Sequence, residues 1–424
     1  MFRKALVLAG AGAGAGALAL AATGCSSSKS ASSGQAGSGP VTLTYGIWDS
    51  KQKPAMQEMA DAFHASHPNI TINIQLTPNA DYWTKLQTAA ASGTAPDVFW
   101  MSTTRIGLYA GQKQLLSMSD KPGFDNSPFP KSLNDVYTLD GKQYGMPKDF
   151  DTVGLWYNKK LFDAAGVKYP TASWTWQDVI SAAQKLNDPG KGVWGIASPD
   201  WTQENLYNTM LQAGGQPITP DHKKSGFDDP KSLAGLQYAL GFITKYHVSP
   251  TAQQMTDTQP DQLFASGKVA MFADGDYDMP EYKAAAGLEA DVAPLPAGPD
   301  GKKATVINGL ANVIYAKTKH AQAAWEFVQY LGTKEANEIQ AKTGTVIPAY
   351  NGLSATWVAS TPQYHLQSFI DQLDDAVPYP VSKNTAAWTT PMQAALDQIW
   401  GGKLDLTTGV KQIADQMNAE LAKE

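Results

Sequence analysis

Aromatic side chains stand beside acidic residues at several points where a predicted strand ends. The groups are Trp48-Asp49, Asp97 to Trp100, Asp149-Phe150-Asp151, Asp200-Trp201 and Asp274 to Tyr277. A flat ring can cover the apolar C–H face of a sugar, and carboxylates can accept hydrogen bonds from the hydroxyls on its rim. The pattern therefore favours a carbohydrate site, although at each single position a core aromatic beside a turn-forming aspartate is the alternative.

Motifs of the common hydrolases and nucleotide-binding proteins are missing. The sequence has no Gly-x-Ser-x-Gly, and none of its Gly-Lys pairs is followed by Ser or Thr. Asp274, Asp276 and Asp278 imitate the start of a calcium loop, but Met279 and Ala285 stand where an EF-hand needs Gly and Glu. We therefore expect no cofactor and no metal site. Spacing alone does not exclude a carboxylate pair for glycoside hydrolysis, so a secreted glycosidase stays as the alternative.

The elements that must position these residues follow an α/β pattern. Residues 41–47 and 70–76 alternate apolar and polar side chains, with a helical pattern between them, and Asp97 to Trp100 is a further short strand. Past Gly145 a similar order of strands and helices begins again, and Thr175 with Asp178 predicts a capped helix start. Since strand ends in open α/β sheets face the crevice where ligands bind, two α/β lobes around a cleft are the economical interpretation.

The composition excludes several classes of protein. With 424 residues, the chain is long enough for about two globular units. Hydrophobic residues make up 43% and charged residues 17%, which fits neither a disordered chain nor a polytopic membrane protein. A formal net charge of -6 argues against nucleic acid as a partner, because a phosphate backbone is held by positive charge. A single cysteine excludes an intramolecular disulfide.

The first 40 residues differ from the rest. Arg3 and Lys4 precede an uncharged stretch of Ala, Leu, Val and Gly, which is typical of an export signal. Cys25 follows, and the Ser/Gly-rich run after it predicts a flexible tether. This order resembles a bacterial lipoprotein, with residues 1–24 as signal peptide, Cys25 as the lipidated residue and 25–40 as tether. Ala22 stands where such signals usually have Leu.

Six segments resemble the family 1 extracellular solute-binding proteins of carbohydrate-uptake ABC transporters, the group that includes maltose-binding protein. They are Tyr45-Gly-Ile-Trp-Asp, Gly93-Thr-Ala-Pro-Asp-Val-Phe-Trp, Tyr144-Gly-Met-Pro-Lys-Asp-Phe-Asp, Leu155-Trp-Tyr-Asn-Lys-Lys-Leu-Phe, Phe264-Ala-Ser-Gly-Lys-Val-Ala-Met-Phe and Gly344-Thr-Val-Ile-Pro. Each is weak alone, but together and in this order they are specific. The resemblance covers residues 41–424.

The resemblance implies a fold. It is the two-lobed α/β fold of the periplasmic binding proteins, of type II or Venus-flytrap form, in which three hinge crossings join the lobes. The crossings map near Met146 to Thr152, Ile307 to Leu310 and Thr345 to Ala349. Lobe 1 is then expected over 41–147 and 311–346, and lobe 2 over 148–307 and 350–424.

The resemblance also implies a set of ligand-binding residues. They are Trp48, Asp49, Asp97, Trp100, Arg105, Asp149, Asp151, Trp201, Asp276, Tyr277, Asn308 and Trp388. Tyr277 stands where Trp is the usual residue, and its hydroxyl can add a hydrogen bond. For Asp97, a strand-end cap is the equal alternative to a ligand contact.

The implied function is binding without covalent chemistry. The protein is expected to be a monomer, anchored by lipid to the outer face of the bacterial cell membrane, that hands a mono- or oligosaccharide to an ABC transporter permease. A receptor of the same fold for another solute is a further alternative. An anionic solute would favour an arginine cluster, whereas Arg105 is the single arginine of the globular part.

Overall fold

The computed structural model describes residues 39–424 of the chain. The signal peptide, Cys25 and nearly all of the tether expected from the sequence lie outside these residues. The described part forms one unit, Pro40–Glu424. None of its helices combines the length and the apolar character needed to cross a lipid bilayer.

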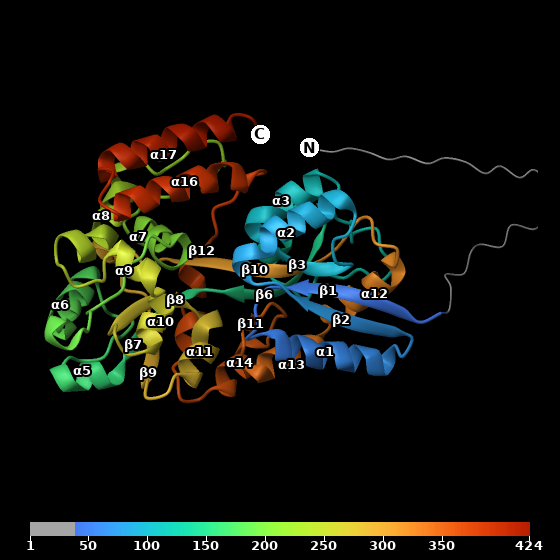
Figure 1. The fold of residues 1–424 in the computed structure, drawn as a ribbon, viewed down its shortest axis with the longest axis horizontal. Coiled ribbons are helices and arrows are strands. Elements are labelled where there is room, and N and C mark those ends of the chain that lie inside the picture. The colour runs from blue at the N-terminus through green and yellow to red at the C-terminus, as the bar shows by residue number, and fades with distance from the viewer. Residues whose placement is uncertain (1–38) are drawn as a thin grey trace, which may run out of the picture. The chain divides into compact units, whose positions relative to one another are not determined.

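The larger of the two main sheets is built mostly from the first part of the chain (Figure 1). Its strands lie in the order β11-β6-β10-β3-β1-β2, and β12 adds to β10. Their bounds are β1 Val41–Ile47, β2 Ile70–Leu76, β3 Val98–Ser102, β6 Gly145–Asp151, β10 Thr305–Ile314, β11 Ile347–Pro348 and β12 Ala376–Pro378. β1 runs parallel to β2 and β3, as expected from the sequence, and β10 runs antiparallel to β3 and β6.

The helices between the first three strands follow their sequence signals. α1, Lys53–Ser66, has a proline in its first turn and buries Met56, Met59 and Phe63 against the sheet. α2, Asn79–Ser92, ends at Gly93, which takes the left-handed conformation that glycine tolerates best. The first strands and helices therefore form the predicted parallel α/β unit.

The smaller main sheet has the order β8-β7-β9, with β7 Val153–Asn158, β8 Met271–Gly275 and β9 Ala290–Pro294. All its pairings are antiparallel, so this sheet differs from the first. α6, Trp176–Leu186, begins with the predicted capping box: Thr175 accepts from the Asp178 amide, and Asp178 accepts from the Thr175 amide.

The remaining elements surround these sheets. The helices are α3 Thr103–Gly111, α4 Lys131–Val136, α5 Lys159–Ala165, α7 Tyr207–Gln212, α8 Pro230–Thr244, α9 Ala252–Asp257, α10 Pro260–Ala265, α11 Met279–Ala284, α12 Ala321–Leu331, α13 Lys334–Thr343, α14 Ser354–Ser360, α15 Gln367–Ile370, α16 Thr385–Trp400 and α17 Leu406–Leu421. A two-stranded hairpin joins β4 Thr138–Leu139 to β5 Lys142–Gln143. Short 3-10 helices lie at Pro189–Lys191, Asp276–Asp278, Pro299–Gly301 and Leu373–Asp375, and a π-helix lies at Thr202–Leu206. In Figure 1, α16 and α17 lie beside α7 and α8.

The chain passes between the two sheets at three places. β6 ends in the larger sheet at Asp151, and β7 begins the smaller sheet at Val153. β10 pairs with β12 up to Ile307 and with β6 from Asn308 onward. The third passage follows β11, which pairs with Phe150 and Asp149 of β6. We call the part around the larger sheet lobe 1 and the part around the smaller sheet with α16 and α17 lobe 2; the residue boundaries expected above stay a prediction.

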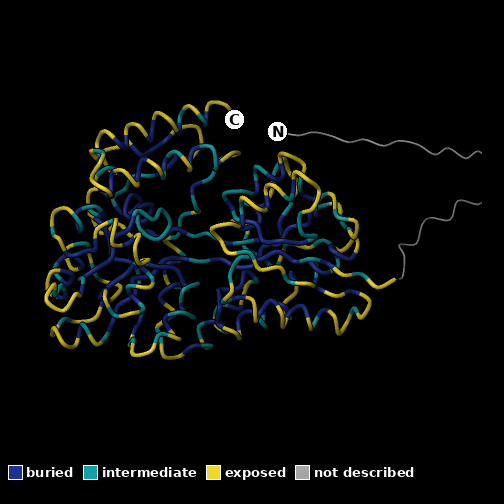
Figure 2. The backbone as a smooth tube through the Cα atoms, in the orientation of Figure 1, coloured by how far each residue is buried: buried dark blue, intermediate teal, exposed yellow. Residues whose placement is uncertain are grey.

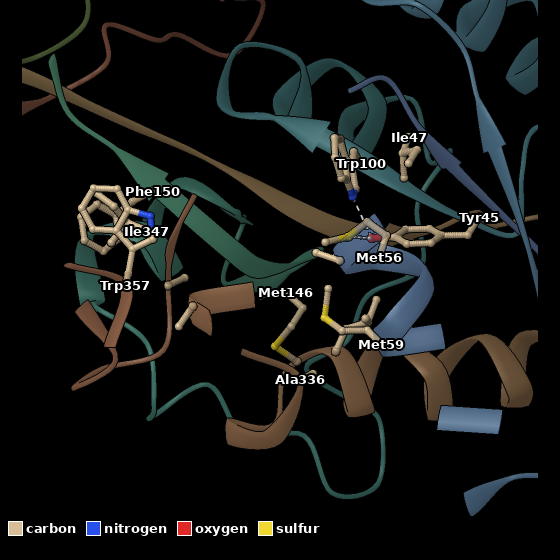
Figure 3. Packing of buried hydrophobic residues seen from close by; sticks show 14 of the residues in the cluster. Tyr45, Ile47, Met56, Met59, Trp100, Met146, Phe150, Ala336, Ile347 and Trp357 are labelled. Atoms are coloured by element: carbon tan, nitrogen blue, oxygen red, sulfur yellow. Dashed lines mark hydrogen bonds between the residues drawn. The ribbon is translucent and has the colours of Figure 1, made fainter. Parts of the chain in front are cut away.

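Buried residues, dark blue along the backbone in Figure 2, run through both lobes. Within lobe 1, Tyr45 and Trp100 are fully buried, and the Trp100 indole N–H donates to the Tyr45 hydroxyl at 2.7 Å (Figure 3). Met56, Met59 and Met146 lie close to this pair in the same view. The end of β1 is therefore seated on a close-packed core, which fixes the position of the residues that follow it.

Candidate functional site

A cavity of about 500 Å³ lies between the lobes, where β1, β3 and β6 end. Lobe 1 contributes Trp48, Asp49, Lys51, Gln52, Asn79, Trp83, Ser102 and Thr104. The crossing segments contribute Asp149, Phe150, Asp151, Asn308, Leu310 and Val346, and lobe 2 contributes Gln203, Glu204, Tyr277, Asp278 and Tyr379. The cavity thus has aromatic and polar side chains on both sides.

Two tryptophans form the aromatic wall of lobe 1. Trp48 follows β1 and Trp83 lies on α2, and their ring centroids are 5.5 Å apart. Trp100 supports Trp48 from behind, with its ring edge-on at 5.1 Å and an interplanar angle of 88°. The guanidinium of Arg105 lies 5.5 Å from the Trp83 ring centroid. This wall can offer aromatic surface to an apolar ligand face.

Two carboxylates lie at the first crossing. Asp149 is held by the Lys148 ammonium at 2.5 Å and accepts from the Leu310 amide at 2.8 Å, so its charge is compensated. Asp151 has a neutral partner, the side-chain amide of Gln203. Burial raises the pKa of Asp151 well above its usual range, and the negative charges of Asp149 and Glu204 raise it further.

A chain of side-chain hydrogen bonds runs from lobe 1 to lobe 2 across the second crossing. Thr103 at the start of α3 donates to Asn308 at 2.7 Å. The Asn308 side chain in turn donates to the side-chain oxygen Oε1 of Gln203 at 2.7 Å, and the side-chain nitrogen of Gln203 donates to Asp151. These bonds orient the amides and the carboxylate at the base of the cavity, ready to bind polar groups of a ligand.

The lobe 2 side contains a π-helix at the cavity wall. In Thr202–Leu206 the wider turn includes a bond from the Leu206 amide to the Trp201 carbonyl, and it presents Gln203 and Glu204 to the cavity. Tyr277 donates its hydroxyl to Glu204. Burial raises the pKa of Glu204, and the bond from Tyr277 opposes that rise.

The structure brings half of the expected site residues to this cavity. Those that line it are Trp48, Asp49, Asp149, Asp151, Tyr277 and Asn308. Those that do not line it are Asp97, Trp100, Arg105, Trp201, Asp276 and Trp388. These six residues lie outside the cavity lining for separate structural reasons.

Asp97 is a strand-end cap, the alternative that the sequence left equal to a ligand contact, and it does not line the cavity. It precedes β3 and therefore lies at the end of the strand opposite to the cavity. Its carboxylate accepts from the amide and hydroxyl of Thr44 at 2.9 and 2.8 Å and from the Thr318 hydroxyl at 2.5 Å. These three bonds join the start of β3 to β1 and to the segment that follows β10.

Trp388 and Asp276 are buried and do not line the cavity. Trp388 lies in α16 within the lobe 2 core, is 1% exposed and donates to the Ser382 hydroxyl at 2.9 Å. Asp276 has no exposed surface and accepts from the Ile347 amide of β11 at 3.3 Å. It belongs to the packing of the third crossing.

Trp100, Trp201 and Arg105 lie behind residues that line the cavity. Trp100 is fully buried beneath Trp48. Trp201 precedes the π-helix and packs edge-on against Phe272 with centroids 5.8 Å apart. Arg105 reaches Trp83 and not the cavity itself. Each is a support for the wall of the cavity.

Several cavity residues are absent from the set of ligand-binding residues expected from the sequence. They are Lys51, Gln52, Asn79, Trp83, Ser102, Thr104, Phe150, Gln203, Glu204, Asp278, Leu310, Val346 and Tyr379. A signal existed for Gln203 and Glu204, because the Asp200-Trp201 pair just before them marks the same region. Trp83 stands in a predicted helix, where an aromatic residue is equally typical of the buried face, so the sequence does not mark it as a cavity residue.

A second cavity, of about 700 Å³, lies on another side of α3. Ile106 and Gly107 of α3 line it together with Val381, Ser382 and Leu421 of lobe 2. It contains none of the expected site residues, and the strand residues that line it, Thr138 and Leu139, belong to the short β4–β5 hairpin and not to a main sheet. The smaller cavity at the strand ends is therefore the candidate site.

Within residues 39–424, no three His, Cys, Asp or Glu side chains converge in a way that could hold a metal ion. Asp274, Asp276 and Asp278, which imitate a calcium loop in sequence, point to different partners. Asp274 accepts from Tyr282, Asp276 from Ile347 and Asp278 from Lys51. Each of the three carboxylates therefore accepts from a different protein group.

Two α/β lobes, three crossings and a polar, aromatic cavity between the lobes define the class of two-lobed solute-binding proteins. Residues 48–338 match the family described as bacterial extracellular solute-binding protein, and the chain belongs to this family. This confirms the resemblance and the fold class expected from the sequence.

Individual relatives are similar over most of the chain. A maltooligosaccharide ABC transporter solute-binding lipoprotein of Streptococcus pneumoniae is 26% identical over 366 residues, 84% of this chain and 83% of the relative. The maltodextrin-binding protein MdxE of Bacillus subtilis is 27% identical over 335 residues, 75% of this chain and 76% of the relative. Among solved structures, an ABC substrate-binding protein from Listeria monocytogenes in complex with cycloalternan has a TM-score of 0.85 at 28% identity and covers 90% of this chain and 99% of its own.

Proposed function

We propose that this protein captures a mono- or oligosaccharide in the cavity between its lobes and delivers it to the membrane subunits of an ABC transporter. The observation that carries the proposal is the composition of the cavity: Trp48 and Trp83 on one side face a set of carboxylates and amides on the other. Aromatic faces and hydroxyl acceptors together match the two surfaces of a sugar ring. The maltooligosaccharide, maltodextrin and cycloalternan ligands named for the similar proteins support it.

The proposed mechanism is a change in the balance between open and closed lobes. A sugar that contacts both lobes binds the closed state better and therefore increases its population. The permease then recognises the closed form, and no covalent step is required. A dissociation constant in the micromolar range, corresponding to about -8 kcal/mol, allows both capture and release.

The location follows from the same proposal. The family is described as extracellular, and the N-terminal sequence has the order of an export signal followed by Cys25. We propose that Cys25 carries the lipid that anchors the protein to the outer face of the cell membrane, and that the receptor acts there as a monomer.

Titration with a panel of mono- and oligosaccharides tests the proposal. Trp48 and Trp83 lie in the cavity, so intrinsic tryptophan fluorescence should change as a sugar binds. Saturable binding with one sugar per chain and no change of the sugar on chromatography is the expected result. Release of shorter sugars would favour the glycosidase, and a lack of response to the whole panel would favour a receptor for another solute.

A further inference from the structure

Lys51 joins the two lobes across the edge of the cavity. It lies in the segment between β1 and α1, and its ammonium is 2.7 Å from the Asp278 carboxylate and 2.6 Å from that of Glu281. Asp278 and Glu281 belong to lobe 2, in the 3-10 helix after β8 and on α11. Among the ion pairs of residues 39–424, these are the ones that cross from lobe to lobe at the cavity.

Hydrogen bonds within lobe 1 hold the segment that carries Lys51 in place. Asp49 accepts from the Lys51 amide at 2.7 Å and from the Gln52 side chain at 3.0 Å. Gln52 also accepts from the buried Lys148 ammonium at 2.6 Å. Asp49 therefore uses both carboxylate oxygens inside its own turn, which directs Lys51 toward lobe 2.

Lobe 2 receives Lys51 in an acidic corner made of Asp261, Asp274, Asp278 and Glu281. Burial raises the pKa of Asp278, and Lys51 opposes that rise. The pKa of Asp261 is raised by burial and by Asp278 and Glu281, and Lys51 again opposes it. One oxygen of Asp261 is buried without a hydrogen-bond partner in the described residues. The corner thus concentrates negative charge that a cation from the other lobe relieves.

The pair is also less exposed than an ordinary surface ion pair. The exposed fractions of the Lys51, Asp278 and Glu281 side chains are 32%, 16% and 26%. Burial lowers the pKa of Lys51, but the two carboxylates more than offset this, so its pKa is raised and it stays charged. Because solvent screens this pair only in part, its attraction is stronger than that of a fully exposed pair.

We infer that Lys51 is a lobe-closing residue: its ion pair with Asp278 and Glu281 stabilises the closed lobes without a contribution from the ligand. Opening the lobes separates the charges, so removal of the pair favours the open form. Because the ligand binds the closed form better, its apparent affinity falls in proportion to the fraction of closed protein that is lost. The effect on affinity rests on the proposed function, whereas the effect on the lobes does not.

The distance between the lobes tests this inference directly. In the full chain with Cys25→Ser, spin labels at Gln87→Cys on α2 and Gln184→Cys on α6 occupy exposed positions in the two lobes. Double electron–electron resonance measures the distance between the two labels. Without sugar, Lys51→Met should lower the ratio of short to long label distances by about fivefold. Lys51→Arg should retain the original distribution, and raising the salt concentration should open the parent protein but not Lys51→Met.

The matched control is Lys85→Met, which removes an ion pair with Asp81 inside α2 and should leave the distances unchanged. The double variant Asp278→Asn with Glu281→Gln should open the lobes as Lys51→Met does. Adding Lys51→Met to that double variant should have no further effect, since the interaction is already lost.

Affinity for maltotriose is the second readout. We expect Lys51→Met to weaken it by the factor by which the closed fraction falls, up to about fivefold, and Lys51→Arg to retain the parental value. Unchanged distances in a Lys51→Met protein of normal thermal stability would overturn the inference, even if affinity falls, because Lys51 would then act on the ligand itself. Failure of the parent protein to bind any sugar would contradict the proposed function, and the distances would still decide the inference.

Discussion

Tyr277 donates its hydroxyl to the carboxylate of Glu204 at the lobe 2 wall of the cavity. The two residues come from segments far apart in the chain, the π-helix and the 3-10 helix after β8. Burial raises the pKa of Tyr277 well above its usual range, and the charge of Glu204 adds to the rise. Tyr277 therefore stays a neutral donor, and Glu204 keeps its remaining lone pairs for a ligand hydroxyl.

Removing this donor should shift the pH range of sugar binding. In Tyr277→Phe, the ionised form of Glu204 loses a hydrogen bond, so the pKa of Glu204 rises further. A sugar hydroxyl donates best to the ionised carboxylate, so affinity should fall as pH decreases and should begin to fall at a higher pH in the variant. Fluorescence titrations between about pH 4 and pH 8 measure this. Tyr144→Phe, outside the cavity, should follow the parent profile; identical profiles for all three would contradict the role of Tyr277.

The aromatic wall of lobe 1 should contribute directly to affinity. Trp83→Ala removes cavity-lining surface and should weaken sugar binding about tenfold, as expected for the loss of one aromatic stacking partner. Trp48→Ala should have at least the same effect. Trp176→Ala is the control, because Trp176 stacks on Tyr238 away from this cavity. Isothermal titration calorimetry decides between these outcomes, and full affinity in a folded Trp83→Ala protein would exclude Trp83 from the site.

Trp388 should affect stability and not the site. Its side chain is 1% exposed within the lobe 2 core, so Trp388→Ala should lower the free energy of unfolding by about 3–5 kcal/mol. The fraction that remains folded should bind sugar with parental affinity. Urea unfolding and titration at low temperature separate the two effects. Normal stability with lost affinity would return Trp388 to the binding site.

Gly107 should be needed for the approach of the lobes near α3. A Cβ at this position would lie 2.6 Å from the Lys383 carbonyl oxygen of lobe 2, so Gly107→Ala forces the two apart. Overpacking of this kind costs about 1–3 kcal/mol, and we expect roughly tenfold weaker sugar binding with little change in the fold of either lobe. Gly111→Ala is matched to it, since the same helix has open space there. Equal affinity for both variants would show that α3 and Lys383 separate freely.

Asp200 should make stability depend on pH. Burial raises its pKa to about 6, and the neighbouring Asp397 adds to the rise. The folded state therefore holds the Asp200 proton more tightly than the unfolded state, so this contribution to stability is complete below the unfolded pKa of about 3.9 and is lost as pH rises through about 6.

Asp200→Asn should accordingly be more stable than the parent at pH 8, by on the order of 1 kcal/mol after allowance for partial solvent exposure. The advantage should shrink as pH falls and vanish near pH 4. Thermal unfolding across this range measures it, with the exposed Asp374→Asn as control. A constant difference at every pH would mean that the titration of Asp200 is not its cause.

Residues at recognisable strand ends line the cavity, as the sequence led us to expect, and their contact with a ligand stays a prediction. Trp48 follows β1, and Asp149 and Asp151 close β6, so all three reach the cavity. Asp97 differs because it precedes β3, and its carboxylate caps the strand, which is the alternative left equal to a ligand contact. Sequence order places Asp97 at the start of the strand, and the tertiary structure adds that the Thr44 and Thr318 hydroxyls donate to its carboxylate.

The sequence alone determined the family, the two α/β lobes and the residues that follow the first strands, because periodicity, caps and motifs are local properties of the chain. Tertiary structure decided which segments of lobe 2 meet them. Gln203, Glu204 and Tyr379 reach the cavity through a π-helix and the loop after β12. Lys51 meets Asp278 and Glu281 through the packing of one lobe against the other. Such contacts depend on the packing of residues more than 70 positions apart, and no local pattern encodes that packing.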